Sequence, residues 1–211
     1  MKRTLIITVF VLAYQLGFSQ NTASLKEPPT QSIRLIKGYN RHGSGDIGGI
    51  LFGTEYQKYI TRKVSLSYNI RGTINSSEYT LISPSPISER EIDGSVRFTT
   101  AGVQLGVNGG LSMVRTLRHE FMVNLGALAR YQSSTHGGYS IYPPQTTGMP
   151  ISVVAFDHAS PQQTVSIGGL FQLQYSYTFK NNIALGITPG FQTDSNGDAL
   201  LYAAIVVGKR F

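Results

Sequence analysis

Apolar and polar residues alternate with a period of two along most of this chain. The alternation is clearest in the segments that begin at Val64, Phe121 and Val165. In the first of these, one face carries Val, Leu, Tyr and Ile, while the other carries Ser, Asn, Arg and Thr. Successive side chains of a β-strand point to opposite faces, so this period predicts strands with one apolar and one polar face. No helical period fits these runs, and we expect an all-β protein.

Eight segments show strand patterns, and the connections between them support the count. The segments are residues 32–40, 47–59, 64–75, 101–114, 121–131, 165–179, 183–191 and 198–211. Three connections are tight, around residues 61–62, 116–117 and 180–182, and those between them are mostly longer, at 41–46, 80–97, 133–163 and 193–197. Short turns that alternate with longer loops, on an even number of strands, are typical of bacterial outer-membrane barrels. The sequence therefore predicts an antiparallel eight-stranded up-and-down transmembrane β-barrel over residues 32–211.

The composition of the polar face favours a membrane barrel over a soluble one. A lipocalin-like barrel also has eight strands, but its interior is apolar and its exterior is wet. In this chain the polar face consists mainly of Gly, Ser, Thr, Asn and Gln, with scattered charges. A solvated exterior usually carries more Lys and Glu, whereas small polar side chains suit the narrow lumen of eight strands. We therefore expect the apolar face to point outward, toward lipid.

The N-terminus predicts export from the cytoplasm. Lys2 and Arg3 precede an apolar run from Leu5 to Leu12, and small residues follow at Gly17 and Ser19. This arrangement is typical of a secretory signal peptide, here residues 1–19 with cleavage after position 19. A membrane-anchoring helix is the alternative, but the run is shorter than the roughly 20 apolar residues that such a helix needs. Residues 20–31 are then expected to form a periplasmic leader, and the mature barrel to lie in the outer membrane.

Composition and charge exclude several classes of protein. The chain has no Cys, so it is neither disulfide-stapled nor a lipoprotein. Its formal charge of +7 falls by two, to +5, when Lys2 and Arg3 are removed with the signal peptide. The remaining basic residues are scattered, so we expect no nucleic-acid partner. Those near the tight turns are expected at the periplasmic rim, facing anionic lipid head groups: Arg62, Lys63, Arg115, Arg118, Lys180, Lys209 and Arg210.

Four charged residues fall on the polar, lumen-facing side of the predicted strands. Glu55 and Arg71 lie on adjacent strands within diagonal reach, and Glu120 and Arg130 project into the same interior from another strand. Unpaired buried charges are costly, so we expect these four to form a hydrogen-bonded network. Such a network has two interpretations: a structural plug, or an electrostatic gate in a narrow channel.

The last strand, residues 199–211, supports a family resemblance. Together with the eight-strand plan it resembles the OmpA/OmpX-type outer-membrane barrels, in pattern over about residues 32–211 rather than in a diagnostic string. In that family a C-terminal Phe with apolar residues at alternate positions before it is read by the barrel-assembly machinery. The matching positions here are Phe211, Val207, Ile205, Ala203 and Leu201, while Lys209 departs from the pattern. No peptidoglycan-binding domain is expected after the barrel.

Short motifs that suggest cofactors or catalysis have simpler interpretations. The glycines of residues 43–48 match a dinucleotide fingerprint by letter, but a strand rather than a helix follows them, which favours a turn. Residues 194–198 lack the spacing of a calcium loop, and their Asn-Gly pair indicates a hairpin turn. Two groupings resemble hydrolase residues without a framing motif: Ser134 with His136, and Asp157 with His158 and Ser160. We therefore expect no cofactor, no metal site and no enzyme activity.

The two long loops are the remaining candidate surface. The loop at 133–163 carries Tyr139, Tyr142 and Phe156, and aromatic loop residues on a rigid scaffold are typical of binding. The alternative is that the loops pack over the barrel mouth. The sequence thus predicts a non-enzymatic barrel protein that stabilises the envelope or binds partners through its loops. The alternatives are a small solute channel and, more remotely, a lipid A-modifying enzyme. The expected partners are outer-membrane lipids and lipopolysaccharide, the barrel-assembly machinery and an extracellular protein ligand.

Overall fold

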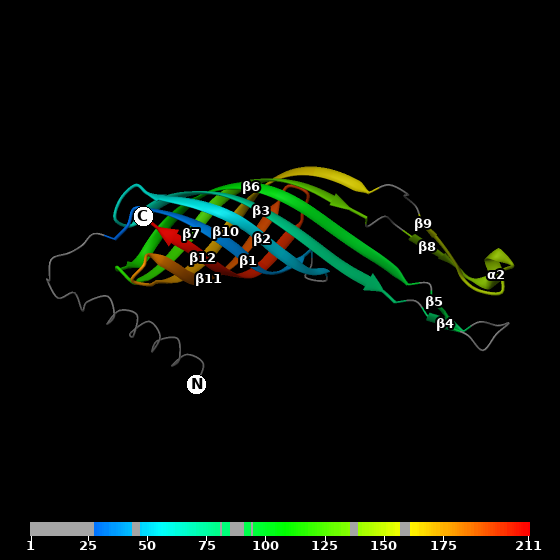
Figure 1. Cartoon of the computed structure of the whole chain (residues 1–211). Helices are drawn as coiled ribbons and strands as arrows, with labels where there is room; N and C mark the ends of the chain where they lie inside the picture. Colours follow the sequence, from blue (N-terminus) through cyan, green and yellow to red (C-terminus); the bar gives the residue numbers. More distant parts are fainter. Residues whose placement is uncertain are drawn as a thin grey trace, which may run out of the picture.

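The computed structural model describes residues 28–43, 47–80, 82–84, 91–93, 95–135, 139–156 and 161–211. Eight long strands form the body of the molecule (Figure 1): β1 (Gln31–His42), β2 (Ile47–Tyr59), β3 (Val64–Tyr79), β6 (Val96–Arg115), β7 (His119–Ser134), β10 (Gln162–Thr178), β11 (Ile183–Asp194) and β12 (Ala199–Arg210). The predicted signal peptide and all but the last four residues of the predicted leader lie outside the described residues.

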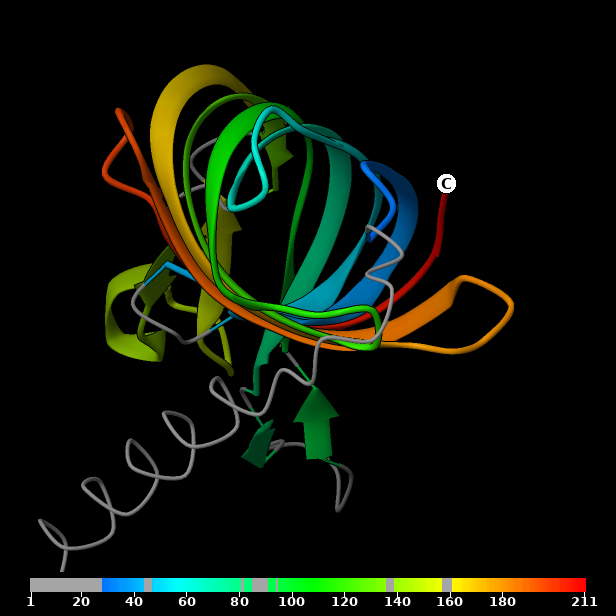
Figure 2. The same ribbon diagram turned by 90° about the vertical axis from the view of Figure 1, so that its left-hand side faces the viewer.

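The eight strands close into a single barrel in the order β1-β12-β11-β10-β7-β6-β3-β2. Every neighbouring pair is antiparallel, and the first and last strands close the ring from Ser32↔Arg210 to His42↔Leu200. Figure 2 shows the ring viewed along the barrel. Closure pairs both edges of each of the eight barrel strands, so the barrel itself has no free edge. The prediction of an all-β, antiparallel, eight-stranded barrel is confirmed.

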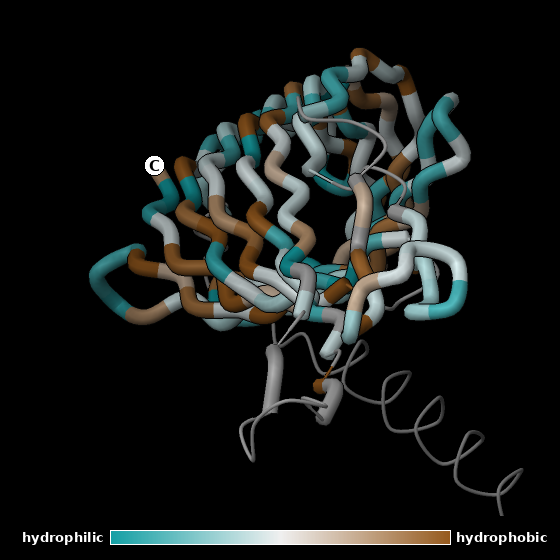
Figure 3. The backbone as a smooth tube through the Cα atoms, turned by 90° about the vertical axis from the view of Figure 1, so that its right-hand side faces the viewer, coloured by the Kyte–Doolittle hydropathy of each residue, from teal (hydrophilic) through white to brown (hydrophobic). Residues whose placement is uncertain are grey.

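The predicted strand faces also lie as expected. On β3, Tyr68 is 51% exposed, whereas its neighbour Asn69 is 6% exposed in the lumen. On β6, Gln104 is 2% exposed and Leu105 is 61% exposed. Apolar and polar residues alternate along the strand traces in Figure 3. The barrel is therefore apolar outside and polar inside, the reverse of a soluble barrel.

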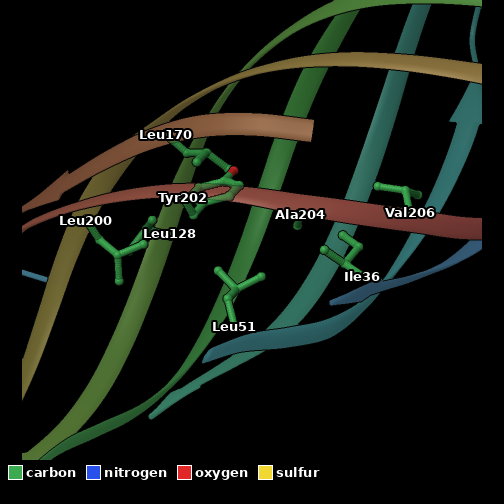
Figure 4. Packing of buried hydrophobic residues seen from close by; sticks show 8 residues of the cluster. All are labelled: Ile36, Leu51, Leu128, Leu170, Leu200, Tyr202, Ala204 and Val206. Atoms are coloured by element: carbon green, nitrogen blue, oxygen red, sulfur yellow. The ribbon is translucent and has the colours of Figure 1, made fainter. Parts of the chain in front are cut away.

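One part of the lumen is apolar, which the alternating pattern did not predict. Its members project inward from β1, β2, β7, β10 and β12 and pack together (Figure 4): Ile36, Leu51, Leu128, Leu170, Leu200, Tyr202, Ala204 and Val206. Leu51 is fully buried and Leu200 is 2% exposed. Burying apolar surface inside the ring stabilises the barrel and fills part of its lumen.

The loops differ from the prediction at one end of the barrel. β3 and β6 extend beyond their predicted ends and pair as far as Tyr79↔Val96, so the connection between them is shorter than expected. Beyond them lie two small hairpins that the sequence did not indicate (Figure 1): β4 (Ile82–Pro84) with β5 (Glu91–Asp93), and β8 (Tyr139–Tyr142) with β9 (Val153–Phe156). A short helix, α2 (Pro144–Thr147), follows β8. No helix in the described ranges is long and apolar enough to cross a membrane.

The three tight turns and the C-terminus lie at the opposite end (Figure 1). The predicted alternation of short turns and longer connections is therefore present. At residues 194–198 the chain forms the expected turn: Gly197 N–H donates to Asp194 O at 3.1 Å, and Gly197 has a φ of 80°. The Asp194 carboxylate accepts the backbone N–H of Asn196 at 3.0 Å, which stabilises the turn.

Candidate functional site

Arg71 is the centre of the polar network in the lumen. It projects from β3, is 1% exposed, and reaches three other strands. Its guanidinium donates to Tyr202 Oη at 2.8 Å and to Gln172 Oε1 at 2.7 Å, on the far side of the ring. Nη2 also lies 3.4 Å from Glu55 Oε2 on the neighbouring strand. Tyr202 in turn donates to Gln172 at 2.9 Å, so the contacts form a connected group.

Arg34 extends the network to a second carboxylate. It lies 3.3 Å from Glu55 Oε1 and 3.3 Å from Glu120 Oε2. Glu120 also accepts hydrogen bonds from Arg210 and Tyr59, and Arg115 Nε lies 3.8 Å from its Oε1. The result is a continuous chain of alternating charge from Arg71 through Glu55, Arg34 and Glu120 to Arg210. Because each charge has an opposite partner, the cost of burial is offset within the lumen.

The structure brings Glu55 and Arg71 together, but it separates Glu120 from Arg130. Arg130 belongs to a second group, where it donates to Thr73 Oγ1 at 2.9 Å, to Gln132 Oε1 at 3.0 Å and to Gln104 Oε1 at 3.4 Å. The partners of Glu120 are instead the arginines described above. The four predicted residues therefore lie in two separate groups, each with its own partners.

Two of those arginines lie at the tight-turn end, as expected, but their side chains are buried and do not face outward. Arg210 is 4% exposed and donates to Ser176 Oγ at 2.9 Å inside the lumen. Arg115 lies over the ring of Tyr59, 3.3 Å from its centroid, and donates to Pro29 O at 2.6 Å. The alternation of the last strand contained the signal for Arg210, because an outward Phe211 places its neighbour inward. The sequence prediction of the lumen network did not include Arg34. Its inward direction could have been found in the same way, because Arg34 alternates in phase with Ser32 and Asn40, which also point inward.

The Arg130 group borders an open cavity at the loop end of the lumen. The cavity has a volume of about 490 Å³ and is lined by His42, Gln132, Ser134 and Asp198, among others. Gln132 Nε2 donates to Asp198 Oδ2 at 2.8 Å, and His42 Nε2 lies 3.7 Å from the same carboxylate oxygen. This end of the lumen therefore forms a polar vestibule.

Of the residues that resemble hydrolase groupings, only Ser134 is described, and it lines this vestibule. Ser134 Oγ lies 2.9 Å from Thr100 Oγ1, and the two hydroxyls share a hydrogen bond. Its suggested partner His136 lies outside the described residues, as do Asp157, His158 and Ser160. Within the described ranges, no group of three or more His, Asp or Glu residues is arranged to hold a metal ion.

The loop residues proposed for binding belong to the β8–β9 hairpin. Tyr139 pairs in register with Phe156, and Tyr142 pairs with Val153. Several apolar side chains of this hairpin and its connection are exposed to solvent: Ile141 at 41%, Tyr142 at 43%, Met149 at 55% and Val153 at 37%. The hairpin therefore presents apolar surface beyond the barrel.

The C-terminal residues of the predicted assembly signal share the outward face of β12. Ile205 is 58% exposed, Val207 is 45% exposed and Phe211 is 52% exposed, and Ala203 lies on the same face. Lys209 is on that face too, close to the end of the strand. This geometry presents alternate apolar side chains on the outside of the closing strand, and their reading by an assembly machinery stays a prediction.

The chain matches no family model and no curated protein. Among solved structures it is similar to Neisserial surface protein A, with a TM-score of 0.55 and 12% identity over 86% of this chain and 97% of that one. It is similar to Ail, the attachment invasion locus protein of Yersinia pestis, with a TM-score of 0.52 and 10% identity over 87% and 99%. It is also similar to the N-terminal β-barrel domain of Pseudomonas aeruginosa OprF, with a TM-score of 0.51 and 12% identity over 87% of this chain and 99% of that one. All three are eight-stranded outer-membrane barrels, and at these identities the likeness concerns the fold.

Proposed function

We propose that this chain is a non-enzymatic integral outer-membrane protein, with a plugged barrel that carries partner-binding loops. The observation that carries the proposal is the inverted distribution of side chains on a closed ring. Apolar residues such as Leu105 and Leu125 are 61% and 64% exposed, while the lumen holds paired Arg and Glu. An apolar exterior of this kind is stable in lipid and unfavourable in water. Closure also satisfies backbone groups that lipid leaves without partners.

The lumen supports a plug rather than a conducting pore. Arg71 reaches from β3 to Gln172 on β10, and Arg34 reaches from β1 to Glu120 on β7. Both contacts cross the interior, and the apolar cluster around Leu51 fills another part of it. A solute would have to break several buried charge-assisted hydrogen bonds to pass, which is costly.

The loop end supports a binding role. The β8–β9 hairpin exposes Ile141, Tyr142 and Met149 beyond the barrel, and exposed apolar surface on a rigid scaffold is typical of interaction sites. The similar barrel of Yersinia pestis is named for attachment and invasion, which is in keeping with a loop-mediated role. The partner is proposed to be an extracellular protein that contacts these apolar side chains.

Membrane insertion is the first test. The purified full chain should insert into lipid vesicles and migrate differently on a gel before and after boiling, as a closed barrel resists detergent. Recovery in the soluble periplasm with identical mobility in both states would contradict the proposal.

Conductance in a planar bilayer separates the plug from a channel. We expect a folded, inserted barrel to show no discrete current steps. Steps that change when Glu55→Gln or Arg71→Gln is introduced would instead support a small channel gated by the lumen charges.

A further inference from the structure

A small basic pocket lies at the end of the barrel that holds the tight turns. It has a volume of about 250 Å³ and is formed by the turn between β6 and β7 and the turn between β10 and β11. The charged side chains that line it are Arg118 and Lys180, both exposed, and none of the described residues lining it is acidic. Leu117 and Phe179, also in the lining, are 49% and 46% exposed. The pocket therefore combines two cations with an apolar margin.

Backbone contacts hold this pocket in a defined shape. Thr178 N–H donates to Arg118 O at 2.6 Å, which joins the two turns directly. Asn182 has a positive φ of 63°, and its carbonyl accepts the N–H of Arg210 at 2.9 Å. Its own N–H donates to Phe179 O at 3.1 Å. These contacts hold the two turns against each other and against the end of β12.

One of the lining residues, Thr178, carries a buried hydroxyl. Thr178 is 3% exposed, and in the part of the chain that the structure describes its Oγ1 has no hydrogen-bond partner. A buried polar group without a partner is unfavourable, so a ligand oxygen that bonds to it gains that interaction. Oxygen atoms that carry negative charge satisfy the hydroxyl and the two cations together.

A second basic pocket, near the β2–β3 turn, has a buried hydroxyl that is already hydrogen-bonded. It has a volume of about 260 Å³ and is lined by Arg62, Lys63, Ser112 and the buried Arg115, among others. Ser112 Oγ already lies 2.9 Å from Tyr59 Oη and donates to Glu120 at 3.4 Å. The two pockets carry the same number of exposed basic side chains, but only the first has an unpaired buried hydroxyl among its described lining residues.

We propose that the pocket of Arg118, Lys180 and Thr178 binds the phosphate group of an anionic phospholipid. The two cations neutralise the phosphodiester, the Thr178 hydroxyl donates to one of its oxygens, and Leu117 and Phe179 contact the glycerol and the first acyl carbons. Phe179 packs edge-to-face on the ring of Tyr177, 5.1 Å between centroids, at the margin of the apolar exterior. The apolar margin favours a lipid over free phosphate. The inference rests on the proposed function, since it takes this end of the barrel to be the periplasmic one.

Native mass spectrometry of the full chain in neutral detergent tests the site. Phosphatidylglycerol should bind more tightly than phosphatidylcholine with the same acyl chains. Arg118→Gln with Lys180→Gln should weaken phosphatidylglycerol binding roughly 30-fold, because each basic residue near an anionic surface contributes on the order of five-fold. Thr178→Val, which keeps the shape and removes the hydroxyl, should weaken it about five-fold.

The matched control is Arg62→Gln with Lys63→Gln, which removes the same charge from the second pocket. It should weaken binding less than about three-fold, since general attraction to the barrel is shared by both pockets. Equal loss in the two double variants would overturn the site and indicate general attraction. Displacement of phosphatidylglycerol by inorganic phosphate at equal concentration would overturn the lipid as the ligand. A barrel that inserts and shows the gel shift but has no lipid preference contradicts this inference alone, whereas failure to insert contradicts the proposed function.

Discussion

Arg34 and Glu120 lie 3.3 Å apart inside the lumen, although 86 residues separate them along the chain. Arg34 lies on β1 and Glu120 on β7, which are not neighbours in the barrel, so their contact crosses the lumen. Both side chains are almost fully buried, at 2% and 1% exposure. The same carboxylate also bonds to Arg210 of the closing strand. Glu120 thereby links its own strand β7 to β1 and to β12, the strand that closes the barrel.

Removal of the charge on Glu120 should therefore be strongly destabilising. Glu120→Gln leaves the buried guanidinium groups of Arg34 and Arg210 without their shared carboxylate, and breaking a buried pair from one side costs about 3–5 kcal/mol. The measurement is the free energy of unfolding in urea, with the unfolded fraction at each urea concentration determined from the intensities of the folded and unfolded gel bands.

The matched control is Glu78→Gln. Glu78 pairs with Arg97 at 3.0 Å, but the two side chains are 46% and 73% exposed. An exposed pair contributes about 0–1 kcal/mol, so this variant should unfold close to the wild type. Equal losses in the two variants would contradict a special role for the lumen network.

A second prediction concerns the space beneath Tyr202. Gly190 lies opposite Tyr202 in register, and a Cβ at this position would collide with the tyrosine ring. Gly190→Ala should push the ring away from Arg71 and Gln172 and lower the free energy of unfolding by about 1–3 kcal/mol. Gly109→Ala is the control, because the nearest atom to its Cβ would be Leu125 O at 3.9 Å. If Gly190→Ala is as stable as Gly109→Ala, the ring is not held as the structure indicates.

The strands and their faces could be predicted from the sequence because the apolar exterior and the mostly polar lumen require different residue types at alternate positions. Tyr68 and Asn69 differ in polarity for that reason, and so do Leu105 and Gln104. Where both faces of a strand carry polar residues, the alternation of apolar and polar residues disappears. Beyond Ile74 β3 continues with the consecutive polar residues Asn75, Ser76, Ser77 and Glu78, so its extension could not be predicted from alternation.

The candidate site was less predictable because its partners depend on strand register and tilt. Alternation placed Glu55, Arg71, Glu120 and Arg130 in the lumen, but it carries no information on which strands face each other across the ring. A basic residue near a strand end was interpreted by position alone, which assigned Arg210 to the rim. Its inward direction follows from the neighbouring Phe211. Residues with long side chains therefore need both the face and the register before a partner can be assigned.

A third prediction follows from a charge on the outer face. Lys37 is exposed on β1, in register with Phe52 and Ile205, and its outward neighbours Leu35 and Tyr39 are 61% and 55% exposed. A Lys within the lipid-facing belt costs about 2–4 kcal/mol at the bilayer midplane and less toward the interfaces. Lys37→Leu should therefore raise the free energy of unfolding in lipid vesicles by about 1–3 kcal/mol.

Lys209 supplies the comparison for that prediction. It also lies on the outward face but near the end of β12, and a long Lys side chain at such a position can extend to a membrane interface. Lys209→Leu should change the free energy of unfolding by less than about 1 kcal/mol. A larger gain from Lys209→Leu than from Lys37→Leu would contradict the proposed position of the belt.

The last prediction separates the barrel from its loops. Ser134 and Gln162 are register partners at the ends of β7 and β10, so a two-residue Asn-Gly turn can replace residues 135–161 and still form a hairpin. The pairing of β7 with β6 and β10 is retained in this variant, and we expect the gel shift and the free energy of unfolding to stay within about 1 kcal/mol of the wild type. Binding of the proposed extracellular protein through the β8–β9 hairpin should be lost. A parallel variant that joins the register partners Tyr79 and Val96 removes the β4–β5 hairpin instead, and should retain that binding. If the first truncation prevents insertion into vesicles, the long loop supports the barrel itself and is not a separate binding element.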